Sequence, residues 1–516
     1  MSQLQRIDYA AVAPLIVVSG AAVAVLVADL FLPLGRRALS IWLALAGTVG
    51  ALVTAVLAGT GPRRTFCVPG TTLPGGVRTG TSCSYVVDHF TVLLTVIFCV
   101  AAAVCLLLSV APVAEDRLPA GEYGFLILCS LAGMITIAAA RDLITIVVAL
   151  EVLTLPVYVL AGLRRGDPRS AEAALKFFLV SVLSGAVTLF GVSLVYGLTG
   201  AVHLDRVAAA LAQRQDLRHL SLTAAAVLLV VVGFAFKVSA VPFHWWAPDT
   251  YQGAPVPIAA FLATASKSAG FAGLLLVLLV AFRPYAFVWG PVLAVLAAAT
   301  MTLGNLVALR QRHMVRLLAW SSVAQAGYLL VPLGVAAGSG GRSDGDLRTA
   351  GAATLAFLSL YVAMSLGAFA CVAWVTRDKP GNAIEDYRGL VRRSPVVAVA
   401  LAFFLLCLAG LPPGFAGLFA KVVVFRSALV GGAGVLALIM AVNTVIGLYY
   451  YLRVAALVFA GPAEAVRPAM ALRAVAAGRP RSLAVAAAIG VTVIGTVVLG
   501  FAPQLVISAG NLAGLP

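Results

Sequence analysis

Charged residues are scarce in this chain. They make up 10% of its 516 residues, whereas 62% of the residues are hydrophobic and the mean hydropathy is +1.06. A soluble protein of this length needs a far more polar surface, so the composition excludes that class. The chain is therefore expected to be an all-α polytopic membrane protein.

The sequence also lacks long polar segments. The largest piece between apolar runs, Gly461 to Arg481, is a short connection and leaves no room for an in-chain dinucleotide-binding or iron–sulfur domain. The seven cysteines show no CxxC or Cys/His spacing typical of a metal site. Cys67 and Cys83 share a predicted outer loop, where a disulfide and two free thiols are both open possibilities. The other five lie in apolar runs and are expected to be small core residues.

Fourteen apolar runs fit the length of about 20 residues that a membrane crossing needs. They lie near 11–32, 40–59, 87–110, 122–140, 143–163, 171–198, 221–247, 255–281, 288–309, 315–335, 350–376, 395–429, 434–460 and 483–506. Three of them are longer than a crossing requires, which indicates tilt, kinks or interruptions. The first run lacks the basic leader and cleavage site of a signal peptide, so it is expected to be a retained helix.

The loop charges predict the orientation of the chain. If the N-terminus faces outward, the alternating loops hold 19 Lys and Arg residues on the inner side and 12 on the outer side. Both termini are then expected on the outer face. The net charge of +16 is explained by this topology and by contact with anionic lipid head groups, so it does not indicate nucleic-acid binding.

Lysine is the rarer basic residue, and it is concentrated in the apolar runs. Four of the five lysines lie well inside these runs, whereas the 30 arginines lie in the loops and towards the span ends; the four are Lys176, Lys237, Lys267 and Lys421. Arginine stays protonated, whereas a buried lysine can lose and regain a proton near neutral pH. This distribution favours groups that titrate.

One carboxylate, Glu151, lies at a comparable position in an apolar run. It and Lys176 flank a predicted hairpin at Arg164 to Pro168 and are expected to pair at similar depth across two helices. Each buried charge costs at least about 2.5 kcal/mol on insertion scales, so five such residues favour an ion or proton pathway. Structural ion pairs are the alternative.

Two of the long runs contain helix breakers beside their lysines. Pro242 follows Lys237 by five residues, and Pro412 and Pro413 precede Lys421. Opened backbone within a bilayer is tolerated only inside protein or beside a wet cavity. The paired breaks predict two inverted repeats, 122–281 and 282–460, flanked by helices in 1–121 and 461–516. Ordinary proline kinks are the alternative.

Two histidines lie near the predicted inner ends of apolar runs. His244 and His313 are candidates to give protons access to the pathway, because histidine titrates near neutral pH; a structural hydrogen bond is the alternative for both. Trp245, Trp246 and Tyr251 are expected in an interfacial aromatic belt.

Four segments together resemble a known family. "KVSAVPFHWWAPDTYQGAPVPIAAFLATASKSAGF", "ALEVLTLPVYVL", "ALKFFLVSVLSGAVTLFG" and "LAGLPPGFAGLFAKVVVF" are similar, in order and spacing, to the antiporter-like subunits of respiratory complex I. The resemblance covers almost the whole chain. Within that family, "PFHWWAPDTYQGAP" is most similar to the subunit N branch of bacterial NADH-quinone oxidoreductases.

The resemblance implies a proton-translocating, non-redox subunit in a bacterial plasma membrane. Glu151 would modulate Lys176, Lys237 and Lys267 would form the central relay, and Lys421 would complete the exit branch. Loosening of the Glu151–Lys176 pair would release a proton towards Lys237. FMN, iron–sulfur clusters and quinone would belong to partner subunits of the membrane and peripheral arms, with no cofactor in this chain. A subunit of a multisubunit cation/proton antiporter is the alternative.

Overall fold

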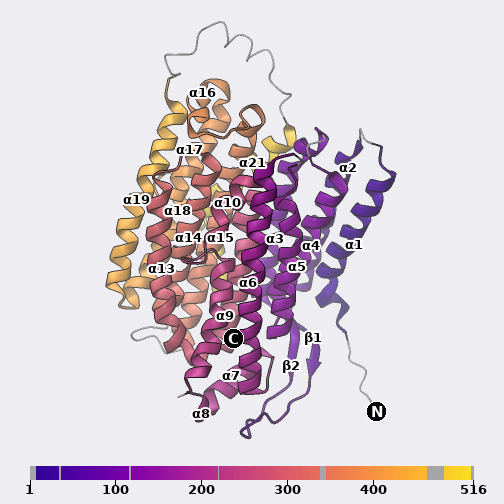
Figure 1. Ribbon diagram of the computed structural model, residues 1–516, viewed down its shortest axis with the longest axis vertical. Helices are drawn as coiled ribbons and strands as arrows, with labels where there is room; N and C mark the ends of the chain where they lie inside the picture. The colour runs from indigo at the N-terminus through magenta and orange to yellow at the C-terminus, as the bar shows by residue number, and fades with distance from the viewer. Residues whose placement is uncertain are drawn as a thin grey trace.

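The computed structural model describes residues 7–33, 36–115, 118–164, 166–218, 220–336, 344–461 and 482–512. Long helices run roughly parallel to the long axis of the molecule (Figure 1). The first half contains α1 (Tyr9–Phe31), α2 (Ala38–Ala58), β1 (Arg63–Val68), β2 (Ser82–Val87), α3 (His89–Ala114), α4 (Ala120–Ala139), α5 (Leu143–Ala161), α6 (Pro168–Thr199), α7 (Leu204–Gln213), α8 (Gln215–Arg218), α9 (Ser221–Lys237) and α10 (Trp246–Gly253).

The second half begins with one helical stretch, Val256–Ala281, that changes its winding along its length. It consists of α11 (Val256–Phe261), a π-helical turn (Leu262–Ser266), α12 (Lys267–Leu276) and a second π-helical turn (Val277–Ala281). The later helices are α13 (Ala286–Ala308), α14 (Met314–Ala336), α15 (Asp344–Asp378), α16 (Leu390–Arg393), α17 (Pro395–Ala409), α18 (Phe415–Val430), α19 (Gly434–Phe459), α21 (Leu483–Phe501) and α22 (Gln504–Leu512), with 3₁₀ turns at Arg283–Tyr285 and Ile384–Tyr387.

Twelve helical stretches among the described residues are long and apolar enough to cross a membrane. This confirms the prediction of an all-α polytopic membrane protein. The other two predicted spans are interrupted, one as α9 and α10 and the other as α17 and α18. The count of fourteen crossings, which includes these interrupted helices, remains a prediction, as do the two inverted repeats. Most of the connection from Gly461 to Arg481 lies outside the described residues.

Three stretches form the centre of the bundle. The most apolar window of α14 is fully buried, and those of Val256–Ala281 and α15 are each 94% buried, against 28% for α6. A helix that is apolar on all sides must be covered on all sides, either by protein or by lipid. The central stretches therefore pack against protein, and α6 presents apolar side chains such as Leu183 on the surface.

The two ends of the bundle differ in chemistry. One end carries the antiparallel hairpin of β1 and β2, in which Cys67 lies opposite Cys83 and forms a disulfide with it, which decides between the two possibilities left open by the sequence. Arg206 of α7 holds this hairpin through the carbonyl oxygen of Pro69, at 2.6 Å. This hairpin end is the lower end in Figure 1. The opposite end carries arginines in its connections and is called the arginine-rich end; Arg164, Arg310, Arg388 and Arg392 lie there.

Aspartate residues begin the two helices that approach the first break. Asp142 caps α5 by accepting from the backbone N–H of Thr145 at 2.7 Å, and Asp167 caps α6 immediately before Pro168. The carboxylate of an N-cap residue accepts a hydrogen bond from a backbone N–H that has no partner within the helix. Proline at the first helical position has no N–H and therefore needs no acceptor. These caps fix where the α5–α6 hairpin starts and so where Glu151 lies.

Candidate functional site

The first interrupted helix ends at a buried lysine. α9 ends at Lys237, the backbone passes through Ser239 with φ of 62° and through Pro242, and α10 begins at Trp246. The break predicted at Pro242 is confirmed. Its opened backbone is partly satisfied by α13, because the N–H of Val241 donates to the Thr300 hydroxyl at 2.9 Å.

Lys237 contacts α5 through a neutral side chain. Only 6% of the residue is exposed, and its Nζ donates to Thr154 Oγ1 at 2.7 Å. Glu151, one turn earlier on α5, interacts electrostatically with the same lysine. On the other side α12 passes close by, since a methyl group at Gly270 would lie 2.9 Å from the Lys237 Cγ. Lys237 therefore sits between a hydroxyl, a carboxylate and a glycine.

Lys267 is the first residue of α12, directly after a π-helical turn. It is 1% exposed, and its Nζ donates to the carbonyl oxygen of Ser322 at 2.6 Å and to the Ser322 hydroxyl. That hydroxyl is 2.8 Å from the Tyr361 hydroxyl, which donates to the carbonyl oxygen of Ala263 at 2.9 Å. Single π-helical turns are frequent at functional sites. Here the turn is the segment that leads into the lysine.

Lys421 lies just beyond the second interruption. α17 ends at Ala409, and α18 begins at Phe415, so the break predicted at Pro412 and Pro413 is confirmed. The Lys421 Nζ donates to the carbonyl oxygen of Ala409 at 2.6 Å and lies 5.5 Å from the centre of the Tyr328 ring. The carbonyl is available because it belongs to the last turn of a helix, where no N–H follows four residues later.

Polar side chains occupy the space between Lys267 and Lys421. Ser321, next to the Ser322 that binds Lys267, is hydrogen-bonded to the Tyr451 hydroxyl of α19. Gln325 of α14 donates to that hydroxyl at 3.4 Å and to the carbonyl oxygen of Leu408 at 3.3 Å. Leu408 precedes the Ala409 that binds Lys421. A line of hydroxyl, amide and carbonyl groups thus leads from one lysine to the surroundings of the other.

The predicted pair of Glu151 and Lys176 is wrong. Lys176 has 49% of its side chain exposed and binds Glu172 at 2.7 Å and Asp249 at 3.2 Å. Glu151 instead faces Gly185, nine residues further along α6, where an added methyl group would lie 2.9 Å from its Oε1. Nine residues turn a helix through 900°, which places Lys176 and Gly185 on opposite faces. Nine residues also correspond to about 13.5 Å along the helix axis, so Lys176 lies neither on the face nor at the depth of Glu151.

Lys176 belongs to a separate charged cluster. Asp249 of α10 also binds Arg316 of α14 at 2.7 Å, and Arg316 binds Gln252 at 2.9 Å. The cluster lines a cavity of about 210 Å³. Among the described residues, no group of three or more His, Cys, Asp or Glu side chains is placed to hold a metal ion.

The two histidines differ in their surroundings. His244 is fully buried, and the centre of its ring lies 4.7 Å from that of Trp245 and 5.3 Å from that of Trp320. Neither ring nitrogen of His244 has a hydrogen-bond partner within the described part of the chain. His313 lies between α13 and α14 and is partly exposed. Burial and the nearby positive charges of Arg164 and Arg316 lower the pKa of His313.

The predicted aromatic belt is wrong for two of its three members. Trp245 is 69% exposed, as an interfacial residue would be, but Trp246 and Tyr251 are 3% and 0% exposed. Trp246 donates from Nε1 to the carbonyl oxygen of Phe236 at 3.1 Å, a carbonyl at the end of α9 that also accepts from the backbone N–H of Ser239 at 2.9 Å. These two rings are part of the packing around the first break.

Several polar residues at the site were not identified from the sequence. They are Thr154, Ser321, Ser322, Gln325, Tyr361 and Tyr451. The segment "WSSVAQAGY" of α14 carries the available signal, since Ser321 and Gln325 are four residues apart on one face of a helix that is buried throughout. Isolated serines and tyrosines in apolar helices usually satisfy their own backbone, so the pattern is weak without the fold.

Known proteins share the sequence of this chain over most of its length. The family model described as "NADH:quinone oxidoreductase/Mrp antiporter, TM" matches residues 140–447. The NADH-quinone oxidoreductase subunit N 2 of Streptomyces griseus is 52% identical over 467 residues, which cover 89% of this chain and 84% of that protein. The NADH-quinone oxidoreductase subunit N of Salinispora tropica is 47% identical and covers 98% of this chain and 99% of its own length.

Two solved structures share the fold of this chain but differ in their sequence identity to it. A chain of respiratory complex I from Thermus thermophilus with bound aureothin matches with a TM-score of 0.74 and 32% identity, covering 96% of this chain and 98% of that one. A chain of the Mrp complex from Dietzia matches with a TM-score of 0.79 but only 22% identity, covering 98% of this chain and 96% of that one, and so shares the fold alone. Since both structures share the fold, sequence identity decides the family: this membrane-spanning chain belongs to the NADH-quinone oxidoreductase subunit N family.

Proposed function

We propose that this chain is a proton-translocating membrane-arm subunit of an NADH:quinone oxidoreductase, and that protons pass along Lys237, Lys267 and Lys421. The observation that carries this proposal is the chemistry of the three ammonium groups. Each is buried, and each donates to a hydroxyl or carbonyl oxygen and makes no salt bridge within the described residues. A line of polar groups leads from the second lysine to the surroundings of the third.

Neutral partners distinguish a relay from a set of structural ion pairs. A buried charge that only held helices together would be expected to have an opposite charge in contact, because an unpaired charge is costly in an apolar medium. A lysine that hydrogen-bonds to hydroxyl groups can pass a proton to them or to water and receive another. The arrangement therefore supports transfer better than permanent pairing.

Glu151 is the group proposed to control the first lysine. Because its carboxylate acts on Lys237 rather than on Lys176, a change in its position or protonation would alter Lys237 directly. Quinone reduction elsewhere in the complex would supply that change. The onward route would run from Lys267 past Ser322 to its neighbour Ser321, and then through Tyr451 and Gln325 towards Lys421.

Access is proposed from the arginine-rich end. His313 lies at that end, and His244 lies buried beside the first break. Positively charged connections favour the cytoplasmic side, and a disulfide favours the oxidising side, so the hairpin end would face outward. Asp8, directly before α1, donates its N–H to Thr65 of the hairpin at 3.2 Å, which supports an N-terminus on that outer side.

The redox cofactors are proposed to lie in partner subunits. FMN and iron–sulfur clusters would belong to the peripheral arm, quinone would be reduced outside this chain, and related antiporter-like subunits would lie beside it in a bacterial plasma membrane. Purification in mild detergent provides the check. Co-purifying flavin and iron–sulfur subunits support this assignment, whereas only small membrane subunits would favour the cation/proton antiporter.

A lysine substitution tests the pathway. Lys237→Met is introduced into the assembled complex, which is reconstituted into vesicles, and quinone reduction and proton uptake are recorded together. Lys379→Met is the matched control, because Lys379 is the one lysine outside the membrane helices and is exposed. Fewer protons moved per quinone reduced in Lys237→Met, with a normal ratio in Lys379→Met, is expected. An unchanged ratio in Lys237→Met would refute the pathway.

A further inference from the structure

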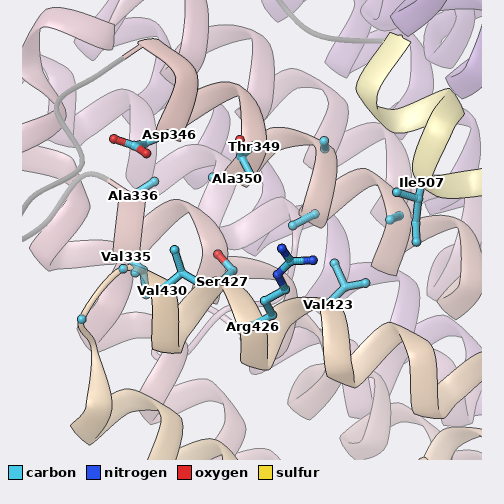
Figure 2. A pocket seen from close by; sticks show the side chains of 15 residues that line it. Val335, Ala336, Asp346, Thr349, Ala350, Val423, Arg426, Ser427, Val430 and Ile507 are labelled. Carbon is cyan, nitrogen blue, oxygen red and sulfur yellow. The ribbon is translucent and has the colours of Figure 1, made fainter.

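A large cavity lies further along α18 from Lys421, near the hairpin end. Its volume is about 760 Å³, within the range of about 300–1,000 Å³ typical of small-molecule sites. The end of α14, the start of α15, the end of α18 and α22 line it. Figure 2 shows Val335, Thr349, Val423, Arg426, Val430 and Ile507 among the side chains that line it.

Arg426 is the cation of this cavity. It lies four residues before the end of α18, or about 6 Å along the helix axis, and its side chain is exposed. Within the described residues it makes no salt bridge, although Asp346 of α15 also lines the cavity. A guanidinium in a membrane helix near the lipid boundary needs water or an anion. Snorkelling to water is the simple alternative, but it does not require a hollow lined by hydroxyl groups beside the residue.

We propose that the cavity binds a membrane phospholipid, with its phosphate on Arg426 and an acyl chain along the apolar wall. The planar guanidinium can donate two parallel hydrogen bonds to a phosphate. The hydroxyl groups of Thr349 and Ser427, which also line the cavity, can donate to the remaining oxygens. Val423, Val430 and Ile507 supply the apolar surface that free phosphate would leave uncovered.

The position of the cavity also fits a lipid. Head-group phosphates lie at the ends of membrane helices, and four helical segments end or begin around this cavity. A phospholipid there would hold the end of α18 against α15 and α22. Since α18 also carries Lys421, the lipid would support the helix of the last proposed relay residue without touching the lysine.

Retention of lipid by the purified complex tests the proposal. The complex is delipidated with mild detergent, and bound phospholipid is counted by native mass spectrometry before and after adding back phosphatidylethanolamine or phosphatidylglycerol. Arg426→Gln should lose one phospholipid per complex, or bind added lipid about tenfold more weakly. Arg426→Lys should retain part of the binding. Arg453→Gln, at an exposed arginine of α19 outside the cavity, is the control and should bind as the unmodified complex does.

Two further measurements locate the lipid. A photoreactive phosphatidylethanolamine should label peptides of α18 or α22, and this labelling should fall when Val423→Trp fills the cavity. Equal lipid counts in Arg426→Gln and the unmodified complex would overturn the proposal. So would displacement of the lipid by inorganic phosphate alone, or a quinone found in the cavity in its place.

Discussion

The two interrupted helices hold their lysines by different kinds of contact. At the first break, Lys237 is the last residue of α9 and binds the side chain of Thr154 on another helix, with Glu151 close by. At the second break, Lys421 follows the interruption and binds the main-chain carbonyl of Ala409, which ends the preceding half of the same span. Polar backbone binds the lysine at the second break, whereas the first break offers a hydroxyl group and an acidic side chain.

This difference assigns the two breaks different parts in the proposed relay. The last turn of a helix carries a partial negative charge, and Lys421 is held by such a turn through a bond that no other side chain can change. Lys237 has a side-chain acceptor and a carboxylate, both of which can move or change protonation. In our proposal the surroundings of Lys237 at the first break can therefore change. Those of Lys421 at the second break stay the same, and Lys421 receives the proton.

The largest effect is expected when either lysine is removed. Lys421→Met should lower the number of protons moved per quinone reduced by about tenfold or more, as Lys237→Met should, because each removes a proton-transfer group. If the two breaks act in series, the double substitution should be no worse than either single one. Vesicle assays of the three variants, run beside Lys379→Met, measure this directly.

Additive losses would contradict the serial arrangement. If the two lysines served independent routes, each single variant would retain the pumping of the other route. The double variant would then fall well below both. That result would show that Lys237 and Lys421 serve separate routes, and the proposal that one passes its proton on to the other would be wrong.

A second prediction concerns the side-chain acceptor at the first break. Thr154→Val keeps the shape of the residue and removes the hydroxyl that accepts from Lys237, a hydrogen bond to a charged group worth about 1.5–3 kcal/mol. We expect slower pumping and a lower unfolding temperature of the complex. Thr154→Ser should restore both, because it returns the hydroxyl. Normal pumping in Thr154→Val would show that this contact does not position Lys237.

The locations of the breaks and of the buried lysines could be predicted from the sequence. Proline within a long apolar run has a local effect on the backbone, so Pro242 and Pro412 were sufficient to place the interruptions. The disulfide could only be given as one of two possibilities, because a shared outer segment brings Cys67 and Cys83 near each other without fixing whether they pair. Burial of Lys237, Lys267 and Lys421 followed from the length of the apolar runs around them.

The partners of these lysines could not be predicted, because they depend on how helices are rotated against one another. Counting residues from the predicted hairpin placed Glu151 and Lys176 at a similar depth, whereas Glu151 lies level with Gly185. The shift and rotation that bring Gly185 rather than Lys176 opposite Glu151 come from packing between α5 and α6. The role of Tyr451 is hidden for the same reason, since it lies 130 residues from Ser321 in the sequence.

A third prediction compares two glycines that border the lysines. Gly410 has φ of 83°, and an added methyl group would lie 2.8 Å from the Lys421 Cδ; at Gly270 it would lie 2.9 Å from the Lys237 Cγ, in an ordinary helix. Gly410→Ala combines crowding with about 1–2 kcal/mol of backbone strain, so it should lower stability and pumping more than Gly270→Ala. Thermal unfolding and pumping of the two variants provide the measurement, and equal effects would contradict this difference between the breaks.

The smallest effect is expected at His313, which directly precedes α14. Burial, together with Arg164, Arg316 and Arg169, lowers its pKa, while Asp386 acts in the opposite direction. The folded protein then binds this proton less readily than the unfolded chain, whose histidine titrates near about 6.5. Its contribution to stability is present above that pH and is lost as the pH falls below it.

His313→Gln should therefore flatten the decline in unfolding temperature between pH 7 and pH 5. If His313 also passes protons towards α14, the variant should pump more slowly at pH 7 as well. This loss should be smaller than in the lysine variants, because His244 beside the first break would still give protons access. Thermal unfolding at both pH values and pumping at pH 7 separate these two roles. An unchanged pH dependence of unfolding would show that the neutral form of His313 is not favoured by folding, and normal pumping would place proton access elsewhere at the arginine-rich end.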